Sequence, residues 1–434
     1  MTAPATNSAP NNKPRPRRHP RAAAVRIITR VLADREPLDE ALSRVVAEQN
    51  LDSSARAWLQ DVCAGTLRWR GRLDQILDAA SFKKKPTGWL RKVLIVAIYQ
   101  IVAQDRVNPG AVVSETVVEI KRKEGEAPSR FANAVLRKLS EHAQAVRTQA
   151  FPEGAPASEQ ALWASLPDWI WNRLVAQYGL DWSRAYAQAS LERPTVWIRS
   201  REPDFQASWA SEAGSVPGSF RLTEGGSIVE RPGFKEGTFF VQDISSQALI
   251  AEISAEVRKG LGEGPLKALD LCAAPGGKTA GLSWNGFEVI ATDRPEKGGS
   301  RFALLEQTVQ RVAPTARVIQ RGQVASLEPL DLVWVDSPCT GSGILRRHPD
   351  VRWLRQEREL ASLQEVQHKL LKEAWDKVRP GGYLAYSVCS ILKEEGPEAL
   401  SRAQLGGTFV REWLLTPQSP PSGDGFYAAL IRKA

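Results

Sequence analysis

The chain has 434 residues, of which 58 are Lys or Arg and 49 are Asp or Glu, so its formal net charge is +9. This length predicts a multidomain protein, with two or three domains. The apolar fraction of 42% and the charged fraction of 25% exclude a disordered or collagen-like chain, and four Cys are too few for a disulfide framework.

The basic charge is concentrated near the amino terminus. Residues 1–150 contain 26 Lys and Arg against 15 Asp and Glu, whereas residues 151–434 contain 32 against 34. Such an excess favours a polyanionic partner, nucleic acid before an anionic membrane, although a solubilising basic tail gives the same pattern. The sequence has no apolar run of membrane-spanning length and no signal-peptide core, so we expect a cytoplasmic protein with no membrane contact.

The composition along the chain predicts five segments. Residues 1–20 are rich in Pro, Asn and Arg and are expected to form a disordered basic arm. Apolar residues at three- and four-residue spacing predict five to seven short helices, an all-α domain, over residues 21–147. Residues 148–165, rich in Ala, Pro, Glu and Ser, are expected to be a linker, and residues 166–234 a small α+β subdomain.

The fifth segment, residues 235–434, alternates apolar strands with helices. This pattern predicts an α/β domain with a mostly parallel, doubly wound sheet. The strands that we expect are 266–271, 288–292, 317–320, 330–335, 382–387 and 425–432.

The first of these strands runs into a loop of small residues and then into a predicted helix. Such a strand–loop–helix unit is typical of nucleotide-binding sheets, and it has neither the Walker nor the GxGxxG spacing. The second strand leads to Asp293, about 20 residues further on, which suits a contact to ribose hydroxyls. A purely structural unit with an incidental Asp is the alternative. The loop consists of Cys272, Ala273, Ala274, Pro275, Gly276, Gly277 and Lys278.

Two cysteines follow later strands. Cys339 lies in an Asp-Ser-Pro-Cys motif and Cys389 in a Ser-Val-Cys-Ser motif, each just past the carboxyl end of a strand. Ligands bind at that edge of an open α/β sheet, and a thiolate adds readily to an electron-poor ring carbon. A single Cys is more often a small buried apolar residue, but two at one edge favour a site. No CxxC or HxxxH pair accompanies them, so we expect no metal.

These motifs resemble those of the cytosine-5 RNA methyltransferases of the NOL1/NOP2/Sun type. The whole chain from about residue 20 is similar to the bacterial 16S ribosomal RNA members of that family, whose amino-terminal domain resembles NusB. The resemblance implies a NusB-like helical domain, a small α+β insert and an α/β Rossmann-like methyltransferase domain. It rests on residues 130–137, 239–247, 272–279, 336–343, 346–350, 389 and 423–427.

The resemblance also implies the chemistry. S-adenosylmethionine is expected to bind residues 272–278, Asp293, Gln323 and Asp336. Cys389 is expected to be the nucleophile that adds to C6 of a cytosine, and Cys339 to assist loss of the C5 proton and product release. Asp336 is expected to hydrogen-bond the N3/N4 edge of the base, which must leave any stack to enter the pocket.

The chain departs from the family pattern at several positions, none of which is a reacting group. Val388 replaces the usual Thr before the nucleophile, and Ser337 replaces an Ala. Gly396 stands where the family has Asn, and Gln323 stands where it has an Asp that is expected to hold the adenine amine. The spacing between Asp293 and residue 301 is about three residues longer than usual.

Small-subunit ribosomal RNA is the expected partner, and we expect a monomer. Basic residues interleaved with Trp favour phosphate contacts, although charge runs are also typical of a solvated face. The candidates are Arg68, Arg70, Arg72, Lys83, Lys84, Lys85, Arg346 and Arg347.

Three alternative functions remain open. A DNA cytosine-5 methyltransferase would use Cys339 as the nucleophile and leave the Cys389 motif without a role. An RNA-binding or transcription-regulating module with a degenerate methyltransferase domain is the second, and C5 methylation of another RNA, such as tRNA, is the third.

Overall fold

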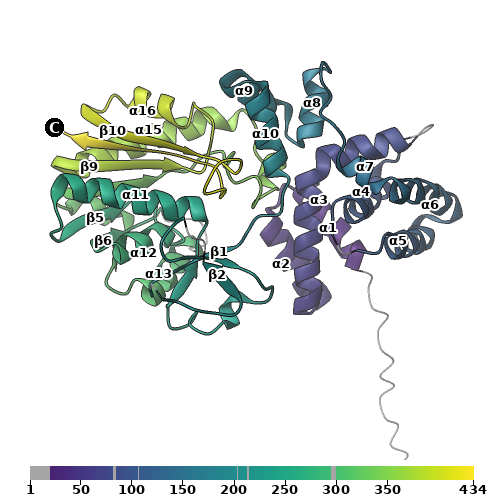
Figure 1. Cartoon of the computed structure of the whole chain (residues 1–434), viewed down its shortest axis with the longest axis horizontal. Helices are drawn as coiled ribbons and strands as arrows, with labels where there is room; N and C mark the ends of the chain where they lie inside the picture. The colour runs from purple at the N-terminus through teal and green to yellow at the C-terminus, as the bar shows by residue number, and fades with distance from the viewer. Residues whose placement is uncertain (1–19, 82–84, 106, 203, 213–214, 295–299) are drawn as a thin grey trace, which may run out of the picture. The chain divides into compact units, whose positions relative to one another are not determined.

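The structure is a computed structural model that describes residues 20–81, 85–105, 107–202, 204–212, 215–294 and 300–434 (Figure 1). The chain divides into two compact units. The helical unit comprises the described residues up to Leu67 and Leu73–Gln149, and the sheet unit comprises Arg68–Arg72 and Ala150–Ala434. None of the described helices is both long enough and apolar enough to cross a membrane.

The helical unit is all-α, as the sequence predicts. An Asp52 carboxylate oxygen accepts the Ala55 N–H at 2.8 Å and so caps α3, while Asn108 caps α5 in the same way. α4 is the centre of the core, because it is buried from Val93 to Val102. Within the described residues the helices are α1 (Pro20–Ala33), α2 (Leu38–Gln49), α3 (Ser53–Ala80), α4 (Gly88–Val102), α5 (Pro109–Glu124), α6 (Glu126–Glu141) and α7 (Ala143–Arg147).

The sheet unit begins with three helices, where part of a linker was expected. The prediction of a linker over residues 148–165 is wrong, because α8 (Ala157–Ala164) packs on α9 (Asp168–Tyr178) and α10 (Leu180–Ser190). Trp163 of α8 is buried in one apolar cluster with Trp171 and Tyr186. The Ala-rich composition that indicated a linker is equally suited to a short helix.

A small antiparallel sheet follows, in the order β2-β3-β1-β4. Its strands are β1 (Trp197–Ser200), β2 (Ala210–Glu212), β3 (Ser219–Leu222) and β4 (Phe239–Val241), and η1 (Ile228–Glu230) lies between β3 and β4. The α+β character of this segment is as predicted. Its boundary at residue 234 is wrong, because Phe239 to Val241 pair with β1 and so belong to the small sheet.

The large sheet has the order β10-β11-β9-β8-β5-β6-β7. The five strands from β9 to β7 are parallel, whereas β11 and β10 are antiparallel additions at one edge. All six predicted strands are present, and β10 is the one that the sequence reading missed, because most of its residues are exposed. The strands are β5 (Leu266–Asp270), β6 (Phe287–Ala291), β7 (Arg317–Val318), β8 (Leu330–Asp336), β9 (Val378–Val388), β10 (Gly407–Leu415) and β11 (Phe426–Lys433).

Helices cover both faces of this sheet (Figure 1). One apolar cluster joins the sheet to α15 and α16, and a second joins its other face to α11 and α12. The chain order reverses between the neighbours β5 and β8, so the carboxyl ends of these strands form the switch point where such sheets bind ligands. The remaining elements are α11 (Ile244–Leu261), α12 (Gly277–Trp284), α13 (Ser300–Val312), η2 (Arg321–Ser326), α14 (Val351–Leu354), α15 (Glu359–Lys377) and α16 (Pro397–Ala403).

Candidate active site

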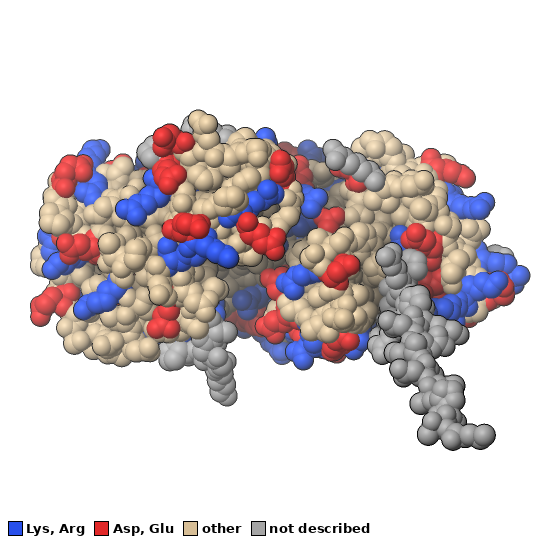
Figure 2. Space-filling model, turned by 90° about the horizontal axis from the view of Figure 1, so that it is seen from below, with Lys and Arg blue, Asp and Glu red and all other residues tan. Residues whose placement is uncertain are grey.

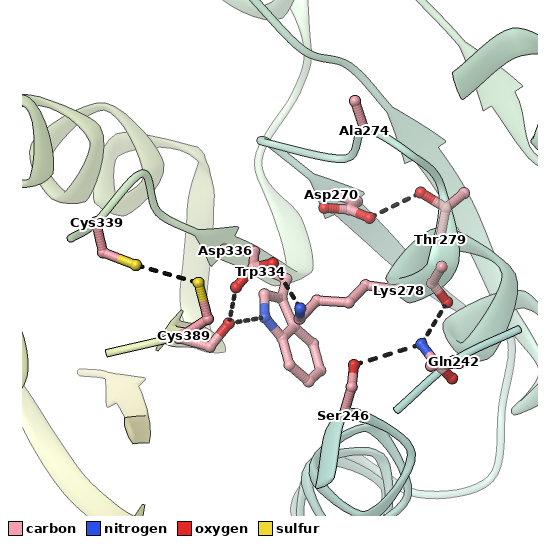
Figure 3. A network of polar contacts seen from close by, with 12 residues as sticks. Gln242, Ser246, Asp270, Ala274, Lys278, Thr279, Trp334, Asp336, Cys339 and Cys389 are labelled. Atoms are coloured by element: carbon pink, nitrogen blue, oxygen red, sulfur yellow. Dashed lines mark hydrogen bonds and ion pairs between the residues drawn. The ribbon is translucent and has the colours of Figure 1, made fainter. Parts of the chain in front are cut away.

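The loops at the carboxyl ends of β5, β6, β8 and β9 bring the predicted catalytic residues and most of the predicted cofactor-binding residues to one edge of the sheet. Figure 3 shows Ala274, Lys278, Asp336, Cys339 and Cys389 among them. Lys278 comes from the start of α12, Asp336 is the last residue of β8, and Cys389 follows β9 directly. β8 and β9 are paired in parallel, with Asp336 opposite Ser387. This pairing is what places two motifs about 50 residues apart side by side.

The loop between β5 and α12 has the shape that a nucleoside-containing ligand needs. Gly276 has a φ of 106°, which strains any residue with a side chain, and a Cβ there would lie only 3.1 Å from Thr308 Cγ2, so this position favours glycine. A Cβ on Gly277 would lie 3.2 Å from the Nε2 of Gln242, which donates to the Gly277 carbonyl at 3.0 Å. Both glycines therefore allow this loop to pack closely against Thr308 and Gln242, and neither carries a side chain that would cover the backbone of the loop.

Asp293 lies two residues after the end of β6 and is buried. Its Oδ2 accepts the Ala274 N–H at 2.7 Å, and its Oδ1 accepts the Arg294 N–H at 2.7 Å. A carboxylate oxygen can accept more than one hydrogen bond, so this side chain retains capacity for ribose hydroxyls. The glycine-containing loop at Gly276 and Gly277, together with the Asp293 carboxylate, is suited to binding a nucleoside cofactor.

Asp270 closes β5 directly before the loop and is fully buried. Its Oδ2 accepts the Thr279 hydroxyl at 2.7 Å, which ties the strand end to α12 across the loop. Its Oδ1 has no hydrogen-bond partner within the described part of the chain. Burial raises the pKa of this carboxyl to about 7, against an ordinary value of 3.8.

Lys278 and Asp336 form an ion pair in which Nζ and Oδ2 are 2.6 Å apart. Burial disfavours the charged ammonium, but the Asp336 carboxylate outweighs it and raises the pKa of Lys278. The Ser387 hydroxyl donates to the other oxygen of Asp336 at 2.8 Å and accepts the Trp334 indole N–H at 2.9 Å. Both oxygens of Asp336 are thus oriented by donors (Figure 3).

The sulfurs of Cys339 and Cys389 are 3.3 Å apart. Cys339 is buried, whereas Cys389 is half-buried. The hydrogen bond with Cys389, together with burial, raises the pKa of the Cys339 thiol well above its ordinary value. The two loops are joined further, since the Gly343 N–H donates to the Cys389 carbonyl at 3.0 Å.

Comparison with known proteins identifies the family. Residues 263–406 match the family model described as 16S rRNA methyltransferase RsmB/F, and residues 18–141 match that of the NusB family. A Citrobacter koseri protein named ribosomal RNA small subunit methyltransferase B is 30% identical over 453 residues, which cover 95% of this chain and 99% of that protein. A Klebsiella pneumoniae protein of the same name is 31% identical over 448 residues, with 95% and 98% covered.

This chain belongs to the ribosomal RNA small subunit methyltransferase B family. It is an S-adenosylmethionine-dependent methyltransferase with a NusB-type helical domain. The solved structure of PH0851 has the same fold, with a TM-score of 0.68 and 20% identity over 96% of this chain and 99% of that one. A methyltransferase homologue from Pyrococcus horikoshii covers 63% of this chain with a TM-score of 0.50 and 21% identity.

Several departures of this methyltransferase from its family pattern have a structural setting. Gly396 lies under the ring of Tyr427, and a Cβ there would be 2.9 Å from the ring, so a larger residue would require Tyr427 or the loop to move. Val388 is buried in the sheet core. The Oε1 of Gln323 accepts the Gln320 N–H at 2.9 Å within η2, so its expected adenine contact stays a prediction. The lengthened spacing after Asp293 falls mainly on residues 295–299, outside the described residues.

The RNA contacts predicted for Arg68, Arg72 and Arg346 are wrong, because all three side chains are buried. Arg68 donates to the Arg346 carbonyl at 2.9 Å, and Arg346 donates to the Ser422 carbonyl at 2.8 Å. Arg72 donates to the carbonyl of Trp163, near the carboxyl end of α8, at 2.6 Å. Carbonyls at a helix carboxyl terminus attract cations, so the end of α8 stabilises the charge of Arg72.

The other RNA candidates have different settings. Arg347 lies between Asp243 and Asp424, with N···O distances of 2.7 Å to each, so its charge is already neutralised. The guanidinium of Arg70 stacks over Trp353, 4.7 Å from the ring centroid. Lys85 is exposed beside Asp78, and its RNA contact stays a prediction, as does that of Arg70. Lys83 and Lys84 lie outside the described residues.

The basic excess of residues 1–150 is largely absent from the described helical unit. Of the 26 Lys and Arg, four belong to residues 1–19, three more to other positions outside the described residues, and three to the Arg68–Arg72 segment of the sheet unit. The helical unit retains 16 basic against 15 acidic residues. On the face shown in Figure 2, Lys and Arg are accordingly interspersed with Asp and Glu.

Sequence reasoning missed two polar residues that contact the cysteine loops. Glu395, which precedes the altered Asn position Gly396, accepts hydrogen bonds from Thr340, the residue after Cys339. Gln367 of α15 donates to the Pro338 carbonyl at 3.0 Å. Two adjacent Glu shortly after a Ser-x-Cys-Ser motif are a signal for the first, whereas nothing in the local sequence distinguishes Gln367. The described residues contain no group of three or more His, Cys, Asp or Glu side chains that could hold a metal ion.

Proposed function

We propose that this methyltransferase methylates C5 of a cytosine in small-subunit ribosomal RNA through a covalent bond between Cys389 and C6. The observation that carries the proposal is the 3.3 Å separation of the Cys339 and Cys389 sulfurs beside the Lys278–Asp336 pair. The substrate class follows from the name of the relatives, which match nearly the whole chain. C5 of cytosine is a weak nucleophile, and adding a thiolate to C6 is what activates it.

The environment of the two thiols supports the assignment of their roles. Cys389 is the more accessible of the two, as a nucleophile must be. Cys339 is buried, and its raised pKa keeps it protonated, so that it can donate its S–H to the Cys389 thiolate. A DNA cytosine-5 enzyme would need the reverse assignment, for which Cys339 is the less suitable thiol.

In the first chemical step, the Cys389 thiolate forms a bond to C6 while the C5=C6 electron pair moves towards C5 and the ring. Asp336 accepts the cytosine amino group, and the Lys278 ammonium balances the negative charge that addition places on the ring. S-adenosylmethionine, when bound, supplies an electrophilic methyl group for C5. The residues that would hold it are the 272–278 loop and Asp293.

In the second step, the C5 proton leaves and its electron pair reforms the C5=C6 bond as the bond between C6 and the Cys389 sulfur breaks. Cys339 relays this proton: it gives its own proton to the departing Cys389 sulfur and accepts the one from C5. Both thiols are then protonated, and Cys389 loses its proton to solvent before the next cycle. The short separation of the sulfurs permits this relay.

The experiment compares wild type with Cys389→Ala and Cys339→Ala. Each is incubated with tritiated S-adenosylmethionine and small-subunit RNA, and the products are run on a denaturing gel. We expect methyl transfer by wild type, none by Cys389→Ala, and a covalent RNA–protein band with Cys339→Ala. Cys63→Ala is the matched control, because Cys63 is buried in α3 of the helical unit, and it should behave as wild type.

Three outcomes contradict the proposal. No transfer by wild type favours an RNA-binding module. Activity in Cys389→Ala but not in Cys339→Ala inverts the roles of the thiols. Label in tRNA but not in small-subunit RNA rejects the substrate class.

A further inference from the structure

Glu395 lies in the loop between β9 and α16, and its carboxylate is fully buried between the two cysteine loops. Its Oε1 accepts the Thr340 N–H at 2.8 Å, and its Oε2 accepts the Thr340 hydroxyl at 2.5 Å. Two hydrogen bonds that one residue donates to one carboxylate hold that residue in both position and rotation. The residue so held is the one directly after Cys339.

The peptide on the other side of Cys339 is held by the same network. Gln367, fully buried on α15, donates through Nε2 to the Pro338 carbonyl at 3.0 Å and to Glu395 Oε1 at 3.2 Å. Cys339 therefore lies between two residues that are both tied to Glu395, directly or through Gln367. Its backbone has little freedom to move without breaking a buried hydrogen bond.

The network extends to the second thiol. The Thr340 hydroxyl is 3.4 Å from the hydroxyl of Ser390, the residue after Cys389, and Ser390 is 2.8 Å from the Ser342 hydroxyl. Tyr386 on β9 donates to the Glu395 carbonyl at 2.6 Å. A single buried network thus touches the neighbour of each cysteine, and Glu395 is the acceptor at its centre.

The charge of Glu395 also favours the form of Cys339 that release requires. Burial raises the pKa of this carboxyl, and the hydrogen bonds that it accepts from Thr340 and Gln367 oppose that rise. Where the carboxylate is ionised, its negative charge disfavours a thiolate on nearby Cys339. Protonated Cys339 is the form that the proton relay requires at the start of product release.

We propose that Glu395 is a positioning residue for the release step: it holds Cys339 against Cys389 so that the C5 proton can be relayed and the sulfur–C6 bond can break. This inference rests on the proposed function. Because the hydrogen bonds of Glu395 to Thr340 hold the Cys339 loop directly, whereas it reaches the Cys389 loop through the 3.4 Å contact between Thr340 and Ser390, its loss should slow release far more than formation of the Cys389–C6 bond and methyl transfer. A residue that only supports the fold would slow both steps equally.

The test variants are Glu395→Gln and Thr340→Val. Gln keeps the size of Glu but turns one acceptor into a donor, which then faces a Thr340 or Gln367 donor. Val keeps the shape of Thr and removes only its hydroxyl. Glu398→Gln is the matched control, because Glu398 is exposed on α16, three residues away, and it should behave as wild type.

Three quantities are measured for each variant. The first is the rate of methyl transfer in a single turnover, with enzyme in excess over small-subunit RNA. The others are the steady-state turnover rate and the amount of covalent RNA–protein band on a denaturing gel. For Glu395→Gln we expect single-turnover transfer close to wild type, steady-state turnover lower by about tenfold or more, and an accumulated RNA–protein band; tenfold corresponds to about 1.4 kcal/mol. Thr340→Val should show the same split. The double variant should lose less steady-state turnover than the sum of the two single variants' losses, expressed as free energies, because both substitutions break the same Thr340–Glu395 interaction.

Every other result overturns the inference. Equal losses in single-turnover and steady-state rates, without an accumulated band, show a structural role only. Unchanged kinetics in both variants show no role. If Glu395→Gln does not fold, as its thermal melt would reveal, Thr340→Val decides by the same criteria. Failure of the proposed function is separate, because wild type would then transfer no methyl group and Cys339→Ala would form no band.

Discussion

Replacing Asp270 with Asn should change how the stability of the sheet unit depends on pH. The carboxyl is fully buried, and burial raises its pKa to about 7 from an ordinary 3.8. Between these two values the folded state binds a proton that the unfolded state has released. Stability therefore falls as the pH rises through this window. One pKa unit corresponds to about 1.4 kcal/mol, so the whole shift amounts to about 4 kcal/mol.

The Asn side chain is neutral at every pH and its oxygen still accepts the Thr279 hydroxyl, so Asp270→Asn removes the penalty and keeps the contact. The assay is urea unfolding at pH 5 and at pH 8, followed by Trp fluorescence over the transition that includes the sheet unit. The difference in unfolding free energy, variant minus wild type, should be about 3 kcal/mol larger at pH 8 than at pH 5. Most of the titration of the buried Asp270 carboxyl lies between these two pH values.

Two further variants sharpen the Asp270 test. Thr279→Val removes the hydrogen bond that lowers the pKa of Asp270, so its stability should fall more steeply with pH than that of wild type. Glu288→Gln removes an exposed carboxylate on β6 and controls for the loss of one charge. If the difference between Asp270→Asn and wild type is the same at pH 5 and pH 8, the buried carboxyl does not titrate in this window and the reasoning is refuted.

Two other predictions concern the arginines and the amino terminus. Arg352 is fully buried and donates to the Ser165 and Ser190 carbonyls at 2.9 and 2.7 Å. Arg352→Leu leaves these buried carbonyls without their donor and should lower the free energy of unfolding in urea by about 3 kcal/mol or more. A loss below about 1 kcal/mol contradicts this role. Deleting residues 1–19 removes four basic residues and should reduce the slope of log K against log salt for RNA binding by about 3. An unchanged slope would mean that other residues neutralise the phosphates.

The cofactor loop and the two cysteine motifs could be recognised from the sequence because their information is local. A strand, a small-residue loop and a helix follow one another over residues 266–284, and an Asp follows the next strand. Each cysteine directly follows a run of apolar strand residues. These patterns reflect backbone geometry that is encoded within about ten residues, so the fold class and the candidate reacting groups could be predicted.

Other features depend on which segments meet, and only the tertiary structure decides that. Arg68, Arg72 and Arg346 look in the sequence like a solvated basic face, yet they bind carbonyls of segments up to 278 residues away. The linker prediction failed for the same reason, because the burial of Trp163 depends on α9 and α10. The same holds for the hydrogen bonds that Glu395 accepts from Thr340, 55 residues earlier in the chain.

The four cysteines show the same division. Their number and order in the sequence indicated a thiol mechanism at one sheet edge, and the pairing of β8 with β9 then brought two of the sulfurs to 3.3 Å. The sequence determines the net charge of +9 and its position along the chain, but not which of the basic side chains are exposed. Composition determines how much charge a chain carries, whereas burial against backbone carbonyls and pairing with carboxylates determine how much of that charge remains available to a polyanion.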